Sequence, residues 1–338
     1  MIDAAWVRDT PKMKMRWIVL ALAGAAVLSL AACGAEQRPL GPGETVRVGT
    51  GPEGVTVGEG AVWVTHPISG TLSRIDPASN KVVGGPIKAG TGGAGGVAVA
   101  DGAVWVASAD NRTLVRIDPE TGKTLAWIDI DGPPAAVAVS EDAVWVTSPF
   151  IGTVWRVDPQ TDQVVATVDI GTDGTGDVAA GEGAIWVSQP SSSTVSRVDP
   201  QTNQIVATIV IDTGRAGGVA VGEGAVWVSD PRAGAVVRID PQSNQVVSTI
   251  TVGSGPVGVV YPHGLAVSEG AVWVTNYNDG TITRIDPATN KVVTTIRVGS
   301  APVGVAVGEG AVWVTNFFGG TVSRIDPQTN QVVSAQHR

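Results

Sequence analysis

The strongest constraint in this sequence is a segment, Ala-Val-Trp-Val or a close variant, that recurs seven times after a Gly-Glu-Gly-like tripeptide. Successive copies of its tryptophan are separated by 42, 40, 41, 41, 46 and 40 residues. A period of this length is typical of β-propeller blades or of solenoid turns. The seven tryptophans are Trp63, Trp105, Trp145, Trp186, Trp227, Trp273 and Trp313.

Each repeat contains four short strand-like segments separated by turn residues. The clearest copies are GVAV (304–307), AVWVTN (311–316), TVSRID (321–326) and KVVTTIRV (291–298). The low charged fraction of 16% and the 44 glycines also favour a β protein rich in turns. The sequence therefore predicts an all-β fold, a seven-bladed β-propeller with four-stranded antiparallel blades of about 40 residues.

The two ends of the repeat array predict how the ring closes. Residues 45–57, TVRVGTGPEGVTV, align with residues 295–307, so residues 45–49 correspond to the end of an outermost strand. The last repeat carries its own candidate, QVVSA, at 331–335. Either segment could complete the seventh blade and so remove an exposed sheet edge.

The features shared by all repeats are expected to be scaffold. Gly, or Asp142 in one repeat, occupies the hairpin position where we expect positive φ, and Asn, Asp or Gly ends each Asp-Pro turn. Strand pairing through a four-residue loop would place Trp63 opposite Arg74 and Trp313 opposite Arg324, with the guanidinium over the indole. Cation binding by the acidic hairpins and anion binding by the Arg-x-Asp-Pro segments are the alternatives, but features repeated in every blade favour a structural role.

The first residues predict export. Lys12, Lys14 and Arg16 precede an apolar run at 18–30, and Leu-Ala-Ala-Cys (30–33) resembles the lipobox of bacterial lipoproteins. That resemblance implies lipidation of Cys33 and removal of residues 1–32. A plain cleaved signal and an uncleaved anchor are the alternatives, and Met1, Met13 or Met15 could be the start.

We therefore expect a signal peptide at 1–32, a lipidated cysteine with a flexible tether at 33–43, and the propeller at 44–338. The anchored protein would face the outside of the cell, on the outer leaflet of the cell membrane or on the outer membrane. Its net charge of −9 disfavours nucleic acid, so the lipid alone would contact the membrane. One cysteine allows no internal disulfide, and we expect a monomer.

Specific function is expected where the repeats differ. In a four-stranded meander, the second-to-third loops and the links between blades lie on the face opposite the constant turns. The sequence varies there, and all three phenylalanines, both tyrosines and two of the three histidines lie there. The predicted binding residues are Glu53, His66, Phe150, Tyr261, His263, Tyr277, Phe317 and Phe318.

Most of these residues belong to blades six, seven and one, which are consecutive once the ring closes. The enlarged spacing of 46 arises from VGVVYPHG (257–264), which places Tyr261 and His263 near the mouth of the central channel. Aromatic side chains on loops above a rigid frame commonly form binding surfaces. The alternative interpretation is that they fill gaps between the loops.

The repeat GTVSRIDPQTNQVVSTI followed by GPVGVAVGEGAVWVTN resembles YVTN-type bacterial propeller repeats and, more distantly, the virginiamycin B lyase group, over residues 45–338. That lyase uses histidine, glutamate and magnesium at one channel mouth. Pro262-His263-Gly264 is similar to its proline-histidine-glycine element, and Glu53 takes the equivalent place in the first blade. No other blade begins with histidine, and His66 is expected in an outer loop, so the paired histidines of the lyase are missing.

We expect a non-enzymatic scaffold whose variable face binds an envelope or extracellular protein, a peptide or a small ligand, with no catalytic residue, no metal site and no cofactor. The alternatives are a lyase-like, Mg-dependent enzyme around His263 and a sensor that holds a small molecule in the channel. Fold analogy cannot choose among these functions.

Overall fold

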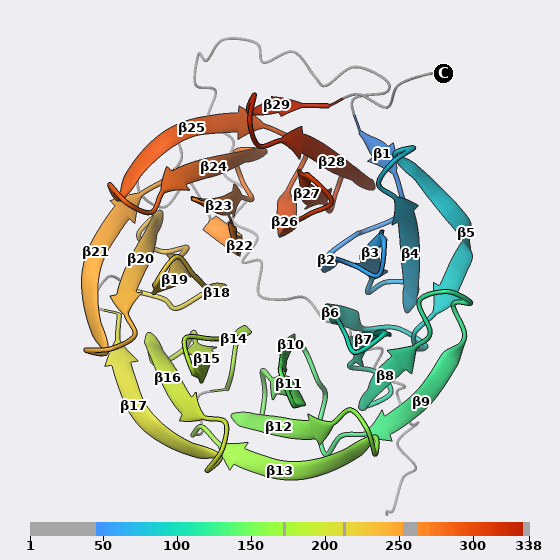
Figure 1. Cartoon of the computed structure of the whole chain (residues 1–338), viewed down its shortest axis with the longest axis horizontal. Coiled ribbons are helices and arrows are strands. Elements are labelled where there is room, and N and C mark those ends of the chain that lie inside the picture. Colours follow the sequence, from blue (N-terminus) through green and yellow to red (C-terminus); the bar gives the residue numbers. More distant parts are fainter. Residues whose placement is uncertain (1–44, 172–173, 212–213, 253–261, 269, 334–338) are drawn as a thin grey trace, which may run out of the picture. The chain divides into compact units, whose positions relative to one another are not determined.

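The computed structural model describes residues 45–171, 174–211, 214–252, 262–268 and 270–333. They form seven antiparallel sheets in a ring, which confirms the predicted seven-bladed β-propeller (Figure 1). In these ranges, no helix has the length and apolar character needed to cross a membrane. Cys33, Tyr261 and the predicted signal and tether segments lie outside the described residues.

Six blades have four strands in chain order from the ring centre outward, and in the seventh two short strands share the outermost position. The innermost strands are β2 (Val55–Gly58), β6 (Ala94–Ala100), β10 (Val137–Ser140), β14 (Val178–Gly181), β18 (Val219–Gly222), β22 (Pro262–Ser268) and β26 (Pro302–Gly308). The second strands are β3 (Ala61–His66), β7 (Ala103–Ser108), β11 (Ala143–Ser148), β15 (Ala184–Gln189), β19 (Ala225–Asp230), β23 (Ala271–Asn276) and β27 (Ala311–Asn316).

The outer half of each blade is equally regular. The third strands are β4 (Thr71–Asp76), β8 (Thr113–Ile117), β12 (Thr153–Asp158), β16 (Thr194–Asp199), β20 (Ala235–Asp240), β24 (Thr281–Asp286) and β28 (Thr321–Asp326). The outermost strands are β5 (Lys81–Lys88), β9 (Thr124–Asp129), β13 (Gln163–Asp169), β17 (Gln204–Val210), β21 (Gln245–Thr251) and β25 (Lys291–Arg297), with β1 (Val46–Arg47) and β29 (Gln331–Val332) in the seventh blade.

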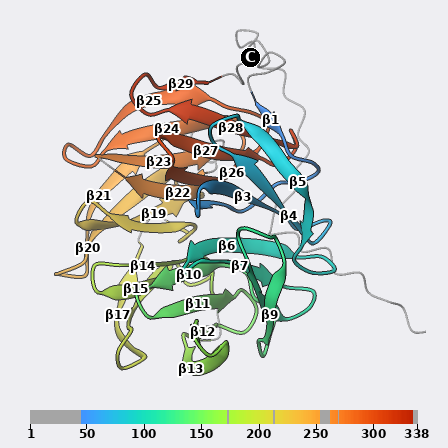
Figure 2. The same ribbon diagram turned by 45° about the vertical axis from the view of Figure 1, so that its right-hand side comes forward.

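The sheets follow one another around the ring in chain order (Figure 2). Each innermost strand contacts the innermost strands of both neighbouring blades, and β26 contacts β2, so the ring is closed. Antiparallel pairing places the first-to-second and third-to-fourth turns at one end of every blade, which we call the turn face. The second-to-third loops and the links between blades lie at the other end, which we call the loop face.

A buried tryptophan in each second strand fills the space between blades. All seven repeat tryptophans have at most 1% of their surface exposed. The indole of Trp63 donates to the carbonyl of Gly58 at 3.1 Å, and that of Trp313 donates to the carbonyl of Gly308 at 3.2 Å. A Cβ at Gly58 would lie 2.7 Å from Val99 of the next blade, so close packing between blades requires glycine there.

An arginine on each third strand lies over the tryptophan of its own blade. The strand register places the two residues directly opposite, as predicted, and the guanidinium carbon is 5.2 to 5.6 Å from the ring centroid. The pairs are Trp63–Arg74, Trp105–Arg116, Trp145–Arg156, Trp186–Arg197, Trp227–Arg238, Trp273–Arg284 and Trp313–Arg324. The cation–π contact therefore recurs in every blade.

Several of these arginines also join their blade to the next one. Nη1 of Arg284 donates to the carbonyl of Pro327 at 2.8 Å and to Oδ1 of Asn330 at 2.9 Å. Arg197, Arg238 and Arg324 make the same pair of bonds to the following blade. The Arg-x-Asp-Pro segments thus serve the scaffold.

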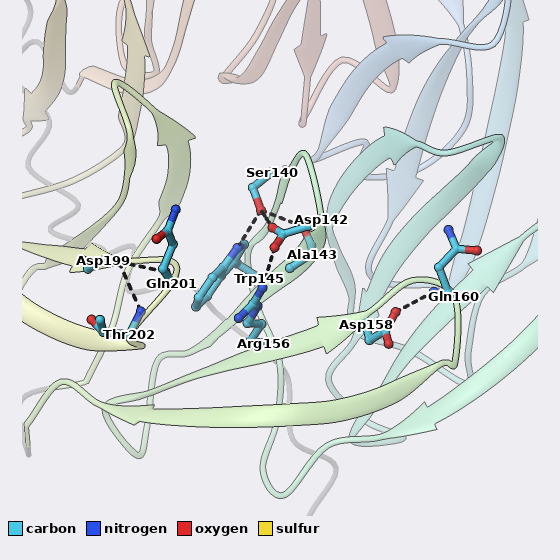
Figure 3. Close-up of polar contacts among 10 residues, drawn as sticks. All are labelled: Ser140, Asp142, Ala143, Trp145, Arg156, Asp158, Gln160, Asp199, Gln201 and Thr202. Atoms are coloured by element: carbon cyan, nitrogen blue, oxygen red, sulfur yellow. Dashed lines mark hydrogen bonds and ion pairs between the residues drawn. The ribbon is translucent and has the colours of Figure 1, made fainter.

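Blade three departs from this pattern (Figure 3). Nη2 of Arg156 lies 2.6 Å from Oδ2 of Asp142, in the hairpin of its own blade. Oδ1 of Asn203, the turn residue of the next blade, is buried without a hydrogen-bond partner among the described groups. Blade three thus has an aspartate in place of the repeat glycine, and its arginine pairs with that aspartate.

The hairpin of blade three differs from its predicted backbone conformation. In blade one both central residues, Glu59 and Gly60, have positive φ, at 52° and 66°, as a two-residue type I′ turn requires. Neither Glu141 nor Asp142 adopts positive φ, so the expectation for Asp142 is wrong. The carboxylate of Asp142 instead contacts Arg156, in a backbone conformation that a residue with a Cβ adopts without strain.

The Asp-Pro turns on the turn face match the prediction. Oδ1 of Asp158 accepts the backbone N–H of Gln160 at 2.8 Å, and Oδ1 of Asp199 accepts that of Gln201 at 2.7 Å (Figure 3). These bonds hold the pKa of both aspartates below its ordinary value. The residues that end the turns have φ between 54° and 68°; they are Asn80, Gly122, Asp162, Asn203, Asn244, Asn290 and Asn330.

Both candidate segments complete the seventh blade. In β1, Val46 pairs with Val322 and Arg47 with Thr321, whereas in β29, Gln331 pairs with Asp326 and Val332 with Ile325. The two strands thus lie along opposite ends of β28 (Figure 1). The outermost position of this blade is shared between the two ends of the propeller.

Candidate functional site

Three aromatic residues form a cluster on the loop face, which we call the aromatic ridge: Tyr277, Phe317 and Phe318. Tyr277 follows β23, and the two phenylalanines follow β27 of the next blade. The ring centroids of Phe317 and Phe318 are 5.5 Å apart, and those of Tyr277 and Phe318 are 6.1 Å apart, both pairs edge-on. Phe318 remains 70% exposed, so it stands above the loops around it.

A groove of about 640 Å³ lies on one side of Phe318. We call it the first groove; its named walls are Arg47, Ile68, Phe317 and Phe318, with glycines between them. Gly51 forms part of its floor with φ of 59°, and a Cβ there would lie 2.9 Å from Ile68 and 3.3 Å from Phe317. These two side chains therefore pack closely over a position where glycine leaves them room.

A second groove, of about 430 Å³, also has Phe318 in its wall. Tyr277, Asn278, Asp279, Arg297 and Phe318 line it. The backbone N–H of Phe317 donates to the carbonyl of Ala301 at 2.9 Å, which ties the ridge to the link before the seventh blade. Phe318 thus lines two hollows, each of which has one arginine in its wall.

Phe150 lies on the same face but away from the ridge. It follows β11 of the third blade, and it is 66% exposed beside Ile151, which is 45% exposed. The structure therefore brings Tyr277, Phe317 and Phe318 together and leaves Phe150 separate.

The predicted position of His66 is wrong. His66 is the last residue of β3 and only 3% exposed, so it does not lie in an outer loop. Its Nε2 lies 2.8 Å from Oγ of Ser73, and its Nδ1 lies 3.4 Å from the carbonyl of Thr50. Burial lowers the pKa of His66, because the charged imidazolium loses hydration there. Polar residues end the other second strands too: Ser108, Ser148, Gln189, Asp230, Asn276 and Asn316.

Glu53 and His263 occupy equivalent positions near the ring centre. The carbonyl of Glu53 accepts a hydrogen bond from Thr315 at 2.7 Å, and that of His263 accepts one from Ser229 at 3.0 Å. Each bond joins adjacent blades, and Val303 takes the same position in the blade between them. The backbone of both residues therefore belongs to the scaffold, and only their side chains differ from the other repeats.

Burial shifts the pKa values of these two side chains in opposite directions. Glu53 keeps part of its surface accessible, yet the protein around it removes enough hydration to raise its pKa to about 7. The pKa of His263 is lowered by burial first and by the positive charge of Arg215 second. Burial thus favours the uncharged form of each side chain, protonated for Glu53 and neutral for His263, in two blades that blade seven separates.

Sequence comparison among the repeats missed Asp177. Asp177 directly follows Gly176, which is the residue of blade four equivalent to Glu53 and His263. At the position of Asp177 itself, the other blades have Gly or Ala. Its Oδ1 accepts the N–H of Val178 at 2.9 Å and its Oδ2 accepts that of Val219 in the next blade at 3.0 Å. Burial nevertheless raises its pKa to about 6. The change from GVAV to DVAA in this repeat was the available signal.

In the part of the chain that the structure describes, no group of three or more His, Cys, Asp or Glu side chains is placed to hold a metal ion. Glu53, Asp177 and His263 come from three different blades.

Comparison with known proteins supports the fold. Residues 212–336 match the family described as "Repeat of unknown function (DUF6923)". No curated protein matches the chain in sequence.

Solved structures with the same fold have different activities. Hydrazine synthase of Kuenenia stuttgartiensis has a TM-score of 0.74 at 13% identity, covering 82% of this chain and 96% of that one. A streptogramin B lyase has a TM-score of 0.73 at 17% identity, covering 83% and 95%. Virginiamycin B lyase from Staphylococcus aureus has a TM-score of 0.71 at 18% identity, covering 81% and 94%. These identities show the fold alone. The resemblance to propeller repeats and to the virginiamycin B lyase group is thus confirmed at the level of architecture, and the chain is a seven-bladed β-propeller built from such repeats.

Proposed function

We propose that this protein is a lipid-anchored, extracytoplasmic β-propeller that acts as a non-enzymatic binding scaffold. Its binding site is the aromatic ridge with its two grooves, and its partner is a protein or peptide of the cell envelope or its surroundings. The anchor is the lipidated Cys33. The observation that carries the proposal is Phe318, which is 70% exposed and lines both grooves.

A side chain exposed to this degree costs free energy in water and gains it only in a complex. Fully covering a phenylalanine is worth roughly 1.5–3 kcal/mol. Aromatic residues at the centre of a patch, bordered by hollows that can accept a partner's side chains, are typical of interaction hot spots. The rigid ring below holds the ridge in place, so little ordering entropy is lost on binding.

The test is site-specific photo-crosslinking in native envelopes. A photoreactive phenylalanine analogue replaces Phe318 in one variant and Phe150 in the matched control, which is also exposed and on the same face. We expect a discrete crosslinked partner from position 318 and none of the same size from position 150. Identical patterns from both positions, or no crosslink at 318, would contradict the proposal.

Lyase activity is the alternative, favoured by the equivalent placement of His263 and Glu53 in blades six and one. A second histidine is not available from His66, which is buried against Ser73. Elimination of a cyclic depsipeptide, lost in His263→Ala and kept in Phe318→Ala, would establish this alternative and overturn the scaffold.

A further inference from the structure

One position on the outer strands differs in charge around the ring. In each blade it is the residue of the outermost strand that pairs with the first residue of the third strand. This pair lies at the end of the blade on the loop face. The position is basic in blades six, seven and one and acidic in blades two and three. In order from blade one the residues are Lys88, Asp129, Asp169, Val210, Thr251, Arg297 and Arg47.

The basic sector contains the aromatic ridge. Tyr277 belongs to blade six, Phe317 and Phe318 to blade seven, and Ile68, 64% exposed, to blade one. The whole chain has a net charge of −9, so this cluster of positive residues runs against the overall balance. The basic residues and the aromatic ridge therefore occupy the same three blades, whereas the exposed Phe150 and Ile151 lie in blade three, where this position is acidic.

We infer that the ridge takes an extended peptide segment in which an Asp or Glu neighbours an apolar residue. This inference rests on the proposed scaffold function and names the class of its partner. In the first groove, the partner's carboxylate pairs with Arg47 while its apolar side chain packs against Ile68 and Phe317. Arginine binds a carboxylate through two parallel N–H donors, which favours an acidic side chain over a neutral one.

The second groove then receives the continuing backbone. Arg297 and Asp279 both line it, so it contains both signs of charge. Such a wall suits the alternating donors and acceptors of a peptide. An anionic bilayer surface, by contrast, would place negative headgroups against Asp279 and would leave two concave hollows unfilled. The observations thus favour a peptide over a membrane.

The test is peptide selection against the full-length protein in detergent. A display library of random twelve-residue peptides is panned separately on the wild type and on Arg47→Gln, Phe318→Ala and the matched control Phe150→Ala. We expect peptides from the wild type and the control to be enriched in Asp or Glu beside an apolar residue. Selection on Arg47→Gln should keep the apolar preference and lose the acidic one.

Binding of one selected peptide then gives magnitudes. Its affinity should fall about fivefold on Arg47→Gln, the size expected of an exposed charge pair. On Phe318→Ala it should fall about tenfold or more, as for an aromatic hot spot. Added salt should weaken binding to the wild type more than binding to Arg47→Gln.

The outcomes separate the two proposals. Peptides that depend on Phe318 but show no acidic enrichment would overturn the ligand class and leave the scaffold intact. No peptide that depends on Phe318 would overturn both. Sedimentation with vesicles containing phosphatidylglycerol, lost in Phe318→Ala while no peptide is selected, would assign the surface to the membrane and overturn the peptide proposal.

Discussion

Nη1 of Arg324 donates a hydrogen bond of 2.9 Å to Oδ1 of Asn80, and so joins the last blade to the first. It also donates to the carbonyl of Pro77 at 2.9 Å, while its guanidinium lies over Trp313. Arg74 lies over its own tryptophan in the same way, but its reach into the next blade is one long bond of 3.4 Å to Glu120. The two arginines thus share the cation–π contact and differ in their bonds to the next blade.

Arg324→Gln should therefore destabilise the protein more than Arg74→Gln. Losing Arg324 leaves two acceptors in blade one without their donor, at about 1–3 kcal/mol in total. The free energy of unfolding in denaturant measures both variants. Equal losses would mean that the cation–π contact, and not the bonds between blades, carries the energy.

Asp142 should control the interface between blades three and four. In Asp142→Gly, the guanidinium of Arg156 loses its carboxylate partner and becomes available to Asn203, as in the blades with a hairpin glycine. Because glycine also tolerates the φ of 57° at this position, Asn203→Gly should then cost about 1 kcal/mol more in the Asp142→Gly background than in the wild type. A double-mutant cycle of unfolding free energies measures this coupling, and a coupling of zero would contradict the proposed exchange.

His66 should tolerate asparagine better than leucine. Asn316, its equivalent in blade seven, donates to Ser323 at 3.0 Å, as an asparagine at position 66 could to Ser73. His66→Asn should thus keep the unfolding free energy within about 1 kcal/mol, whereas His66→Leu leaves Ser73 without this partner at a cost of about 1–3 kcal/mol. Thermal and denaturant unfolding compare the two, and equal behaviour would show that only side-chain volume matters here.

Glu53 should make the protein less stable as pH rises from about 4.5 to about 7. Its folded pKa of about 7 lies above the ordinary value of 4.5, so the folded state binds the proton more tightly. The stabilisation is therefore complete below the unfolded pKa and is lost as pH rises through the folded pKa. Glu53→Gln mimics the protonated acid. It should match the wild type near pH 4 and exceed it by about 1–2 kcal/mol at pH 8, after allowance for solvent screening.

Unfolding free energies at several pH values, taken as the difference between Glu53→Gln and the wild type, check this sign. The difference cancels the other titrating groups, including His66, whose lowered pKa destabilises the fold as pH falls. A difference that does not change with pH would place Glu53 in ordinary contact with water.

Cys33→Ser should abolish the predicted membrane anchorage. Serine cannot form the thioether of a lipoprotein, so the variant should no longer incorporate labelled palmitate and should move to the aqueous phase on detergent partitioning. Phe150→Ala, which leaves the lipobox intact, is the control. Retained label in Cys33→Ser would contradict lipidation at this residue.

The repeats allowed the sequence to be compared with itself, which is why the fold was predictable. The pairing of Trp63 with Arg74 followed from loop length alone. The bond from Arg116 to Asp162 spans 46 residues and depends on how neighbouring blades pack, so no local pattern indicated it. His66 was misplaced because the end of β3 depends on how far pairing continues, a boundary that residue type alone does not define.

The aromatic ridge was predicted and its grooves were not. Tyr277 and Phe318 follow equivalent strands of adjacent blades, so their shared face could be inferred from the repeat. The first groove, however, also needs Arg47, which reaches this sector only because β1 pairs with β28. That wall exists only after the two ends of the propeller have met, and comparison of the loops could not reveal it.

The shared outermost strand of blade seven has one further consequence. Because β1 and β29 pair with the two ends of β28, the first and last strands of the propeller share the place that one outermost strand fills in the other blades. Each of the other blades has an outermost strand. If the chain were opened at one of these strands instead, the seven sheets would stay the same. The order of the blades around the ring is therefore cyclic, and the sequence reports one of several circular permutations of a single architecture.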